Sequence, residues 1–335
     1  MTISPSSLTF GLFGNAGKPA AVAAVRNTVA FLEKRGIDYL VETEVAALLN
    51  ASGAEGEITA DGSVPEGSIA EGSVADGGVA EGSVPEGSVA DRDDIAGEAD
   101  VVIVFGGDGT LLASIQHTLR HDTPVLGVNL GKLGFMSDVS DEEVNWAIEE
   151  ILAGRYHVER RMTLCGHRSG DTQMHHALND IVLAKSGTTK VISIDAYVDE
   201  EFLASFIADG IIVSTPTGST AYSLATGGPV VVPSSDVIVI SPISAHTLTA
   251  RPIIVGGGSV ITLIARSEEG SAYAMVDGVA VLEAQACIEM EIVRGAHNVA
   301  LVKGLGPNYF ETLRAKLSWA QDNRFHVETQ RVHGK

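Results

Sequence analysis

A glycine-rich turn between an apolar strand and a helix constrains this chain more than any other feature of its sequence. Five apolar residues, Val101–Phe105, form an uninterrupted run, which is typical of a buried strand in a parallel sheet. The turn at 106–110 (GGDGT) follows directly, and 111–115 continues as an apolar helix. Glycine lets the backbone approach an anion closely, and a helix N-terminus presents amide donors to it. The sequence therefore predicts an anion site at this turn.

Strands and helices alternate around the turn. Strands are predicted at 8–13, 37–41 and 124–128, and helices at 19–35, 110–119 and 141–152. Pro19 starts the first helix and Gly36 ends it. The alternation predicts that residues 1–135 form a Rossmann-like α/β domain with a parallel sheet.

The pattern changes after residue 156. Short β-rich runs recur at 181–183, 191–194, 210–213, 237–240 and 260–264, and helix returns only at 309–320. A chain of 335 residues is also too long for one ordinary core. We therefore expect a second, mostly antiparallel, β-sandwich-like domain at 136–300.

An acidic segment at 51–100 holds most of the net charge. It has 13 acidic residues and one basic residue, and so contributes −12 of the chain's −21. Within it, residues 61–90 repeat a pentad of acid, Gly, Ser or Gly, Val or Ile, and Ala or Pro. So few apolar side chains favour a disordered loop insertion. A short solenoid is the alternative, and slow amide exchange across the repeat would favour it.

Composition excludes several classes of protein. No apolar run approaches the roughly 20 residues of a membrane span, and the first residues do not resemble a secretory signal. Two cysteines, Cys165 and Cys287, are too few for a disulfide framework and fit the reducing cytoplasm; neither lies in a metal-ligand pattern. The negative charge argues against a nucleic-acid partner. We expect a soluble cytoplasmic protein.

Two familiar nucleotide signatures are incomplete here. Five residues separate Gly11 from Gly17 where a P-loop has four, and Pro19 replaces the metal-binding Ser or Thr. Leu112 stands where a dinucleotide fingerprint has its third glycine. A P-loop enzyme and a hydride-transfer enzyme are therefore both disfavoured.

Asp108 within the glycine turn suggests chemistry as well as binding. A carboxylate would repel phosphate, so its presence implies either a metal ion or the acceptance of a proton from an attacking hydroxyl. The alternative is a structural role, because aspartate is a favoured helix cap.

Two further polar segments accompany it. Residues 209–223 (DGIIVSTPTGSTAYS) end a strand in a turn dense in hydroxyls, which suits polyol or phosphate groups. An ordinary Ser/Thr turn that caps a helix is the alternative. Asn179 and Asp180 precede the run 181–183 and could bind ribose hydroxyls or an amine, or could form a simple strand-entry turn.

Together these three segments resemble the NAD kinase family. Residues 129–135 (NLGKLGF) and 241–252 (SPISAHTLTARP) carry the same resemblance, which covers nearly the whole chain outside the pentads and the tail after 321. GGDGT also occurs in lipid kinases and phosphofructokinases, so the hydroxyl-rich run is what narrows the choice.

The resemblance implies transfer of the terminal phosphoryl group of ATP to the 2′-hydroxyl of the adenosine ribose of NAD, with a divalent cation such as Mg²⁺. It also implies a homo-oligomer, dimer or tetramer, and a C-terminal segment, 301–335, packed on the first domain. Asp108 would accept the proton. No metal ligand is assigned. The nucleotide-binding residues that it implies are Gly106, Gly107, Asp108, Gly109, Thr110, Asn179, Asp180, Lys190, Asp209, Thr220, Ala221, Tyr222, Ser223, Leu224 and Ala225.

The chain departs from the family pattern at a few positions. Ala113 stands where many members have an arginine, Ala245 where proline is usual before His246, and Val279 where a polar residue is common. A lipid kinase that shares GGDGT and a nucleotide-binding regulator without catalysis are the alternative functions. Incubation with ATP, Mg²⁺ and either NAD or a lipid diol separates the three.

Overall fold

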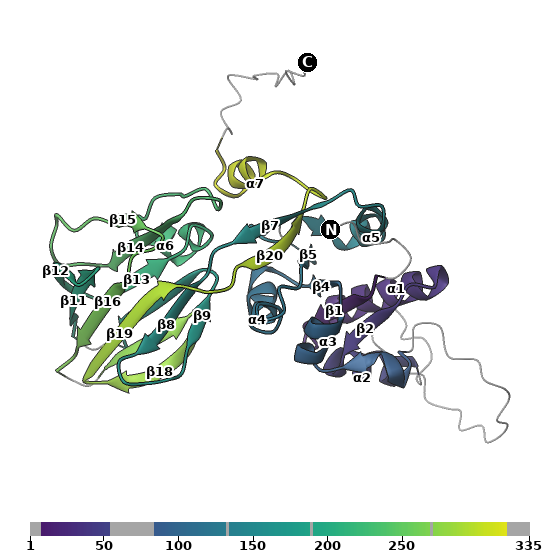
Figure 1. Ribbon diagram of the computed structural model, residues 1–335, viewed down its shortest axis with the longest axis horizontal. Coiled ribbons are helices and arrows are strands. Elements are labelled where there is room, and N and C mark those ends of the chain that lie inside the picture. Colours follow the sequence, from purple (N-terminus) through teal and green to yellow (C-terminus); the bar gives the residue numbers. More distant parts are fainter. Residues whose placement is uncertain (1–7, 54–83, 132–133, 188–189, 269–270, 320–335) are drawn as a thin grey trace, which may run out of the picture.

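A computed structural model describes residues 8–53, 84–131, 134–187, 190–268 and 271–319 of the chain. Two domains lie side by side, and two neighbouring strands, β7 and β20, run between them (Figure 1). Most of the pentad repeat, 61–83, and the tail, 320–335, lie outside the described residues.

The N-terminal domain is built on one sheet of strand order β3-β2-β1-β4-β5-β20-β7, with β6 beside β5. All its pairs are parallel except β20 with β7. Its strands are β1 (Phe10–Gly14), β2 (Tyr39–Glu42), β3 (Val89–Ala90), β4 (Val101–Phe105), β5 (Val125–Asn129), β6 (Val139–Ser140), β7 (His157–Arg161) and β20 (Val299–Lys303). The expected parallel α/β domain is confirmed.

Helices cover both faces of this sheet. They are α1 (Pro19–Arg35), α2 (Thr43–Gly53), α3 (Arg92–Glu98), α4 (Asp108–Thr118) and α5 (Val144–Leu152), with 3-10 turns at Glu86–Ser88 and Asp141–Glu143. Alternate side chains of β4 pack on opposite faces of the sheet. Ile103 joins the core under α1, α2 and α5, whereas Val102 and Val104 join the core under α3 and α4. Helix α1 has the predicted bounds and ends at Gly36, whose φ is +63°.

The end of the acidic segment is ordered, in contrast to the disorder expected for 51–100. Strand β3 pairs in parallel with β2, and α3 packs on β1, where a Cβ on Gly11 would lie 2.4 Å from Ile95 Cγ2. Ile95 and Ala96 are fully buried, and Val89 packs against the core. The prediction is wrong for 84–100 because these apolar side chains bury enough surface to order the chain after the repeats.

The C-terminal domain consists of two antiparallel sheets of six strands, β15-β14-β13-β10-β17-β18 and β12-β11-β16-β19-β8-β9. Its strands are β8 (Leu164–Arg168), β9 (His175–Ala177), β10 (Asp180–Lys185), β11 (Ile192–Val198), β12 (Glu201–Ala208), β13 (Gly210–Ser214), β14 (Val237–Ile243), β15 (Ile253–Gly256), β16 (Ile261–Arg266), β17 (Ala272–Val276), β18 (Val279–Gln285) and β19 (Cys287–Arg294). Burial alternates along β11 and β16, so one core lies between the sheets. The expected antiparallel β-rich domain is confirmed.

Helices are short in this part of the chain. A 3-10 turn at Gly218–Thr220 leads into α6 (Tyr222–Ala225), and α7 (Tyr309–Lys316) follows β20. Among the described residues, no helix combines the length and apolar character needed to cross a membrane.

Strands β7 and β20 form the connection between the domains. The chain leaves the first sheet after β7 and re-enters it at β20, where Leu301 pairs with Val125 of β5. The first sheet thus includes β6 and β7, beyond residue 135, where the sequence places the end of the first domain.

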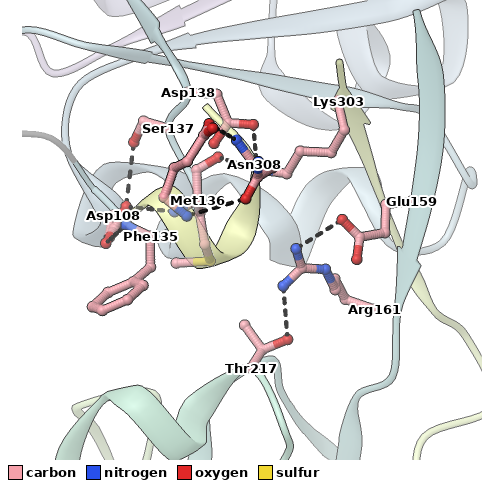
Figure 2. Close-up of polar contacts among 11 residues, drawn as sticks. Asp108, Phe135, Met136, Ser137, Asp138, Glu159, Arg161, Thr217, Lys303 and Asn308 are labelled. Atoms are coloured by element: carbon pink, nitrogen blue, oxygen red, sulfur yellow. Dashed lines mark hydrogen bonds and ion pairs between the residues drawn. The ribbon is translucent and has the colours of Figure 1, made fainter. Parts of the chain in front are cut away.

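A buried ion pair fixes β20 to the first domain. Lys303 Nζ lies 2.7 Å from Asp138 Oδ2 and donates a hydrogen bond of 3.2 Å to the carbonyl oxygen of Met136 (Figure 2). Both charged side chains are less than a tenth exposed. Burial raises the pKa of the Asp138 carboxyl, and Lys303 opposes that rise.

Replacement of the lysine tests this connection. Lys303→Met should lower the free energy of unfolding by about 3 kcal/mol, because it leaves Asp138 buried without its partner. Urea denaturation measures the change. The double variant Lys303→Met, Asp138→Leu should recover most of the loss, since no unpaired carboxyl is left. A single variant as stable as the parent chain would contradict the role of the pair.

Candidate active site

Asp108 is the first residue of α4, and its side chain does not cap that helix. The N-cap is Gly107, without a side-chain cap. The Asp108 carboxylate instead accepts hydrogen bonds from the backbone N–H of Phe135 (2.9 Å), the N–H of Met136 (3.2 Å) and the Ser137 hydroxyl (3.2 Å) (Figure 2). A Cβ on Gly134 would lie 2.1 Å from Asp108 Oδ1, so a larger residue there would displace the carboxylate. The carboxylate is thus held against the segment 134–137.

The hydroxyl-rich turn after β13 packs against Asn179. The N–H of Thr215 donates to the carbonyl of Asn179 (2.9 Å), and the Thr215 hydroxyl donates to the carbonyl of Leu178 (2.5 Å). A Cβ on Gly218 would lie 2.1 Å from the Asn179 oxygen. Two motifs some 35 residues apart in the sequence therefore form one surface.

Many of the hydroxyls in this turn serve the fold. Ser214, Thr215, Ser219 and Ser223 are fully buried. Ser219 Oγ donates to the Pro216 carbonyl (2.6 Å), and Ser223 Oγ lies 3.0 Å from Ser241 Oγ. Tyr222 is 43% exposed, and Thr220 is half-buried. The buried hydroxyls of the turn are thus explained by their hydrogen bonds within the fold. Thr220 and Tyr222 remain accessible to a ligand.

The connecting strands hold the two halves of the site. Arg161 of β7 is 3% exposed and donates to Glu159 (2.9 Å) and to the Thr217 hydroxyl (3.4 Å) of the hydroxyl-rich turn. On β20, Lys303 binds the backbone of the segment that contacts Asp108. Figure 2 shows Asp108, Thr217 and both cations around this junction. The structure therefore brings the GGDGT turn, Asn179–Asp180 and the hydroxyl-rich turn to one place between the domains.

The carboxylate of Asp277 supports the turn at Asn179 and Asp180. Asp277, in the turn between β17 and β18, accepts backbone N–H groups of Leu178 (2.8 Å), Asn179 (2.8 Å) and Asp180 (3.1 Å). Burial, and then the charge of Asp277, raise the pKa of Asp180 from 3.8 to about 7. Burial also raises the pKa of Asp277, against the effect of those three amides. The strand-entry turn is thus built by a carboxylate from a distant hairpin.

Two of the expected ligand residues, Asp209 and Lys190, lie outside the three turns described above. Asp209 is 2.9 Å from Lys185 Nζ and more than a third exposed, between β12 and β13. Lys190 precedes β11 in the other sheet and lines a cavity with Ile207, Arg266 and Glu268, among others; that lining includes no other candidate residue. Within one chain the structure does not join Lys190 to the surface around Asp108.

Two cavities adjoin the GGDGT turn. One of about 420 Å³ is polar, and its lining is Gly14, Asn15, Ala16, Gly17, Lys18, Glu44, Arg92, Gly107, Gly109, Thr110 and Ala113. The other, of about 270 Å³, is largely apolar, and its lining is Gly109, Leu112, Ala113, Gln116, Met174, His175, His176, Val276, Asp277, Val279 and Val281.

The sequence alone did not point to several of these residues. Lys18 and Arg92 follow β1 and β3, and the carboxyl ends of parallel strands are where such sheets bind ligands, so that rule could have found them. Asp277 begins an Asp-Gly pair between two strands, which predicts a hairpin turn but not its contacts. Lys303 carried no local signal.

The raised pKa of Asp180 predicts a pH dependence of stability. In the folded chain Asp180 keeps its proton until about pH 7, whereas the unfolded chain loses it near 3.8. The free energy of unfolding should therefore fall as pH rises from about 4 to about 7. Asp180→Asn should make this fall shallower, because the amide does not ionise. Urea denaturation at pH 5 and pH 8 measures both slopes, and equal slopes would contradict the shifted pKa.

Comparison with known proteins agrees with this geometry. The sequence matches the family models of the ATP-NAD kinase N-terminal domain over residues 10–156 and of the ATP-NAD kinase C-terminal domain over residues 178–304. It is 35% identical to the NAD kinase of Geobacter sulfurreducens over 313 residues, or 92% of this chain and 98% of that protein. It is also 35% identical to the NAD kinase of Cellvibrio japonicus, over 93% and 96% of the two chains.

Two solved structures share the fold. A yeast NADH kinase complexed with NADH superposes with a TM-score of 0.78 at 22% identity, over 96% of this chain and 90% of that one. An NAD kinase from Archaeoglobus fulgidus in complex with ATP gives 0.66 at 20% identity, over 93% and 99%. With both family domains present in order, and with relatives matched over almost their whole length, the chain belongs to the NAD kinase family.

Proposed function

We propose that this protein transfers the terminal phosphoryl group of ATP to the 2′-hydroxyl of the adenosine ribose of NAD, which yields NADP and ADP. The observation that carries the proposal is the position of Asp108 in a glycine turn, at the junction with the Asn179 and hydroxyl-rich turns. A phosphate-binding turn and a polyol-binding surface suit the two reactants.

The proposed role of Asp108 is to accept the proton of the attacking hydroxyl. The ribose oxygen forms a bond to the terminal phosphorus, the bond from that phosphorus to the bridging oxygen breaks, and ADP leaves. Because the transition state of phosphoryl transfer is loose, positioning contributes more than base strength. Three hydrogen bonds from 135–137 support this role, since they fix the carboxylate in one orientation.

The proposed NAD contacts belong to the GGDGT turn, the Asn179 turn and the hydroxyl-rich turn, together with Asp209 beside Lys185. They are Asp108, Gly109, Asn179, Asp180, Asp209 and the segment from Thr220 to Ala225, while the ATP phosphates meet Gly106, Gly107 and Thr110. The exposure of Thr220 and Tyr222 supports the first set, and the polar cavity that Gly107 and Thr110 line supports the second.

A divalent cation such as Mg²⁺ is part of the proposal. Mg²⁺ is usually held by substrate phosphates together with one or two carboxylates. Glu44 supplies a carboxylate to the polar cavity and would contact the ion there. When bound, the ion would neutralise charge on the phosphates. Among the described residues no group of three His, Cys, Asp or Glu side chains is arranged to hold a metal by itself.

We further propose a homo-oligomer that works in the cytoplasm. Strand β12 is at the edge of its sheet and exposes Phe202 (59%) and Ile207 (42%), which supports contact with a second copy. Lys190 lines the same cavity as Ile207, so we place its contact with NAD in the neighbouring copy. Cys165 and Cys287 are free thiols, which supports a reducing compartment.

Substitution of the carboxylate tests the catalytic role. Asp108→Asn should lower kcat by about 10² or more and leave NAD binding largely intact, because the positioned proton acceptor is lost. NADP formation from ATP, Mg²⁺ and NAD measures kcat, and calorimetry measures NAD binding. A lipid diol serves as the alternative acceptor. Activity near that of the parent chain would remove Asp108 from the chemistry, and phosphorylation of the diol alone would indicate a lipid kinase.

The proposed assembly has its own test. Phe202→Asp places a charge on the edge strand and should shift the mass measured by light scattering toward the monomer. Trp319→Asp, at an exposed aromatic residue beyond α7, is the matched control. An unchanged mass for Phe202→Asp would contradict assembly through β12.

A further inference from the structure

The two cavities at the glycine turn adjoin each other at the first turn of α4. Their linings share Gly109 and Ala113, and otherwise differ in chemistry. Ala113 is exposed and presents only a methyl group at this boundary. A longer side chain at 113 would stand between the two spaces.

The polar cavity has the features of a triphosphate site. Lys18 precedes α1 and Arg92 begins α3, and both side chains line the space beside Gly107 and Gly109. The N-cap residues of α1 and α4, Lys18 and Gly107, both line this cavity, and neither helix has a side-chain cap. Pro19 has no N–H, so the amide donors at this cavity come mainly from the start of α4. The cavity is therefore lined by two cationic residues and by the starts of two helices.

Arg92 is fixed before any ligand arrives. Its guanidinium pairs with the buried carboxylate of Glu42, donates to the carbonyl of Gly14 (3.3 Å) and lies 5.4 Å from the ring centroid of Phe13. Such anchoring reduces the entropy that binding would otherwise cost. Lys18 is exposed and supplies the adjustable charge.

The second cavity suits a flat, weakly polar group. Its apolar walls include Leu112, Val276, Val279, Val281 and Met174, and His175 and His176 also line it. Burial lowers the pKa of both histidines, so their imidazoles are neutral at pH 7 and add polarity without charge. A nucleobase matches this lining better than a phosphate does.

We propose that the donor nucleotide lies across the first turn of α4, with its triphosphate between Lys18 and Arg92 and its base in the cavity of Leu112, Met174 and Val279. Ala113 is then the residue that lets one molecule occupy both spaces. This inference rests on the proposed ATP-dependent reaction and specifies the donor side of it. In this chain the cations come from the loops after β1 and β3, and position 113 carries only a methyl group.

The test separates the two halves of the donor. Lys18→Ala should raise the KM for ATP at least tenfold and leave the KM for NAD unchanged, with Lys34→Ala, an exposed lysine in the last turn of α1, as the control. Ala113→Leu should also raise the KM for ATP at least tenfold. Ala23→Leu, at an exposed position of α1, is its control.

Inorganic tripolyphosphate is the second probe, because it has no base. It should inhibit the parent enzyme competitively with ATP. Its inhibition constant should rise for Lys18→Ala and stay unchanged for Val279→Asp, whereas the KM for ATP should rise for both. The exposed positions of Lys18, Ala113 and Val279 leave folding intact, and circular dichroism checks this.

The outcomes bear on different claims. If the parent chain makes no NADP, the proposed function fails. If it makes NADP and the KM for ATP stays within twofold in Lys18→Ala and Ala113→Leu, the donor position is wrong. A change in the KM for NAD in place of that for ATP would assign the cavities to the acceptor and would also overturn the inference.

Discussion

The hydrogen bonds that Asp108 accepts from the backbone of Phe135 and Met136 are the contact on which the rest of the site depends. They join the start of α4 to the segment after β5, and the far side of that segment is held by Lys303. Hydrogen bonds to a charged group contribute about 1.5–3 kcal/mol each, more than neutral ones. The same strand pair that supplies Lys303 also supplies Arg161 to the hydroxyl-rich turn. The carboxylate and the turn are therefore positioned by one rigid connection.

This arrangement explains how a carboxylate could be tolerated among the glycines that we propose bind phosphate. Three donors from the protein face the Asp108 oxygens, so part of their charge is already compensated when a nucleotide approaches. A Cβ on Gly107 or Gly109 would meet no atom within 4 Å, so the space beside these two glycines is free of side chains. In the proposed reaction, binding and proton transfer therefore use different faces of a single turn.

Local sequence patterns predicted the strands and helices that carry the site, but they did not predict its long-range contacts. The apolar run of β4 and the Pro19–Gly36 boundaries of α1 depend on neighbouring residues, which a sequence displays directly. The partners of Asp108 lie 27 to 29 residues away, and Lys303 and Asp138 are 165 residues apart, so no periodicity links them. The acidic composition of 51–100 as a whole favoured disorder, so β3 and α3 were not predicted. Ile95 and Ala96 nevertheless form a small apolar face of their own.

The return of β20 to the first sheet has a consequence for how the protein matures. The ribosome synthesises β20 only after the entire β-rich domain. Leu301 of β20 can therefore pair with Val125 of β5 only late in synthesis. Contacts of such sequence separation form slowly, because a long loop has to close before they contribute. During synthesis β6 can pair with the end of β5, but the start of β5 at Val125 lacks its partner until β20 is made, so completion of the first domain is coupled to the folding of the second. A fragment that stops before residue 299 would expose that part of β5 to other chains.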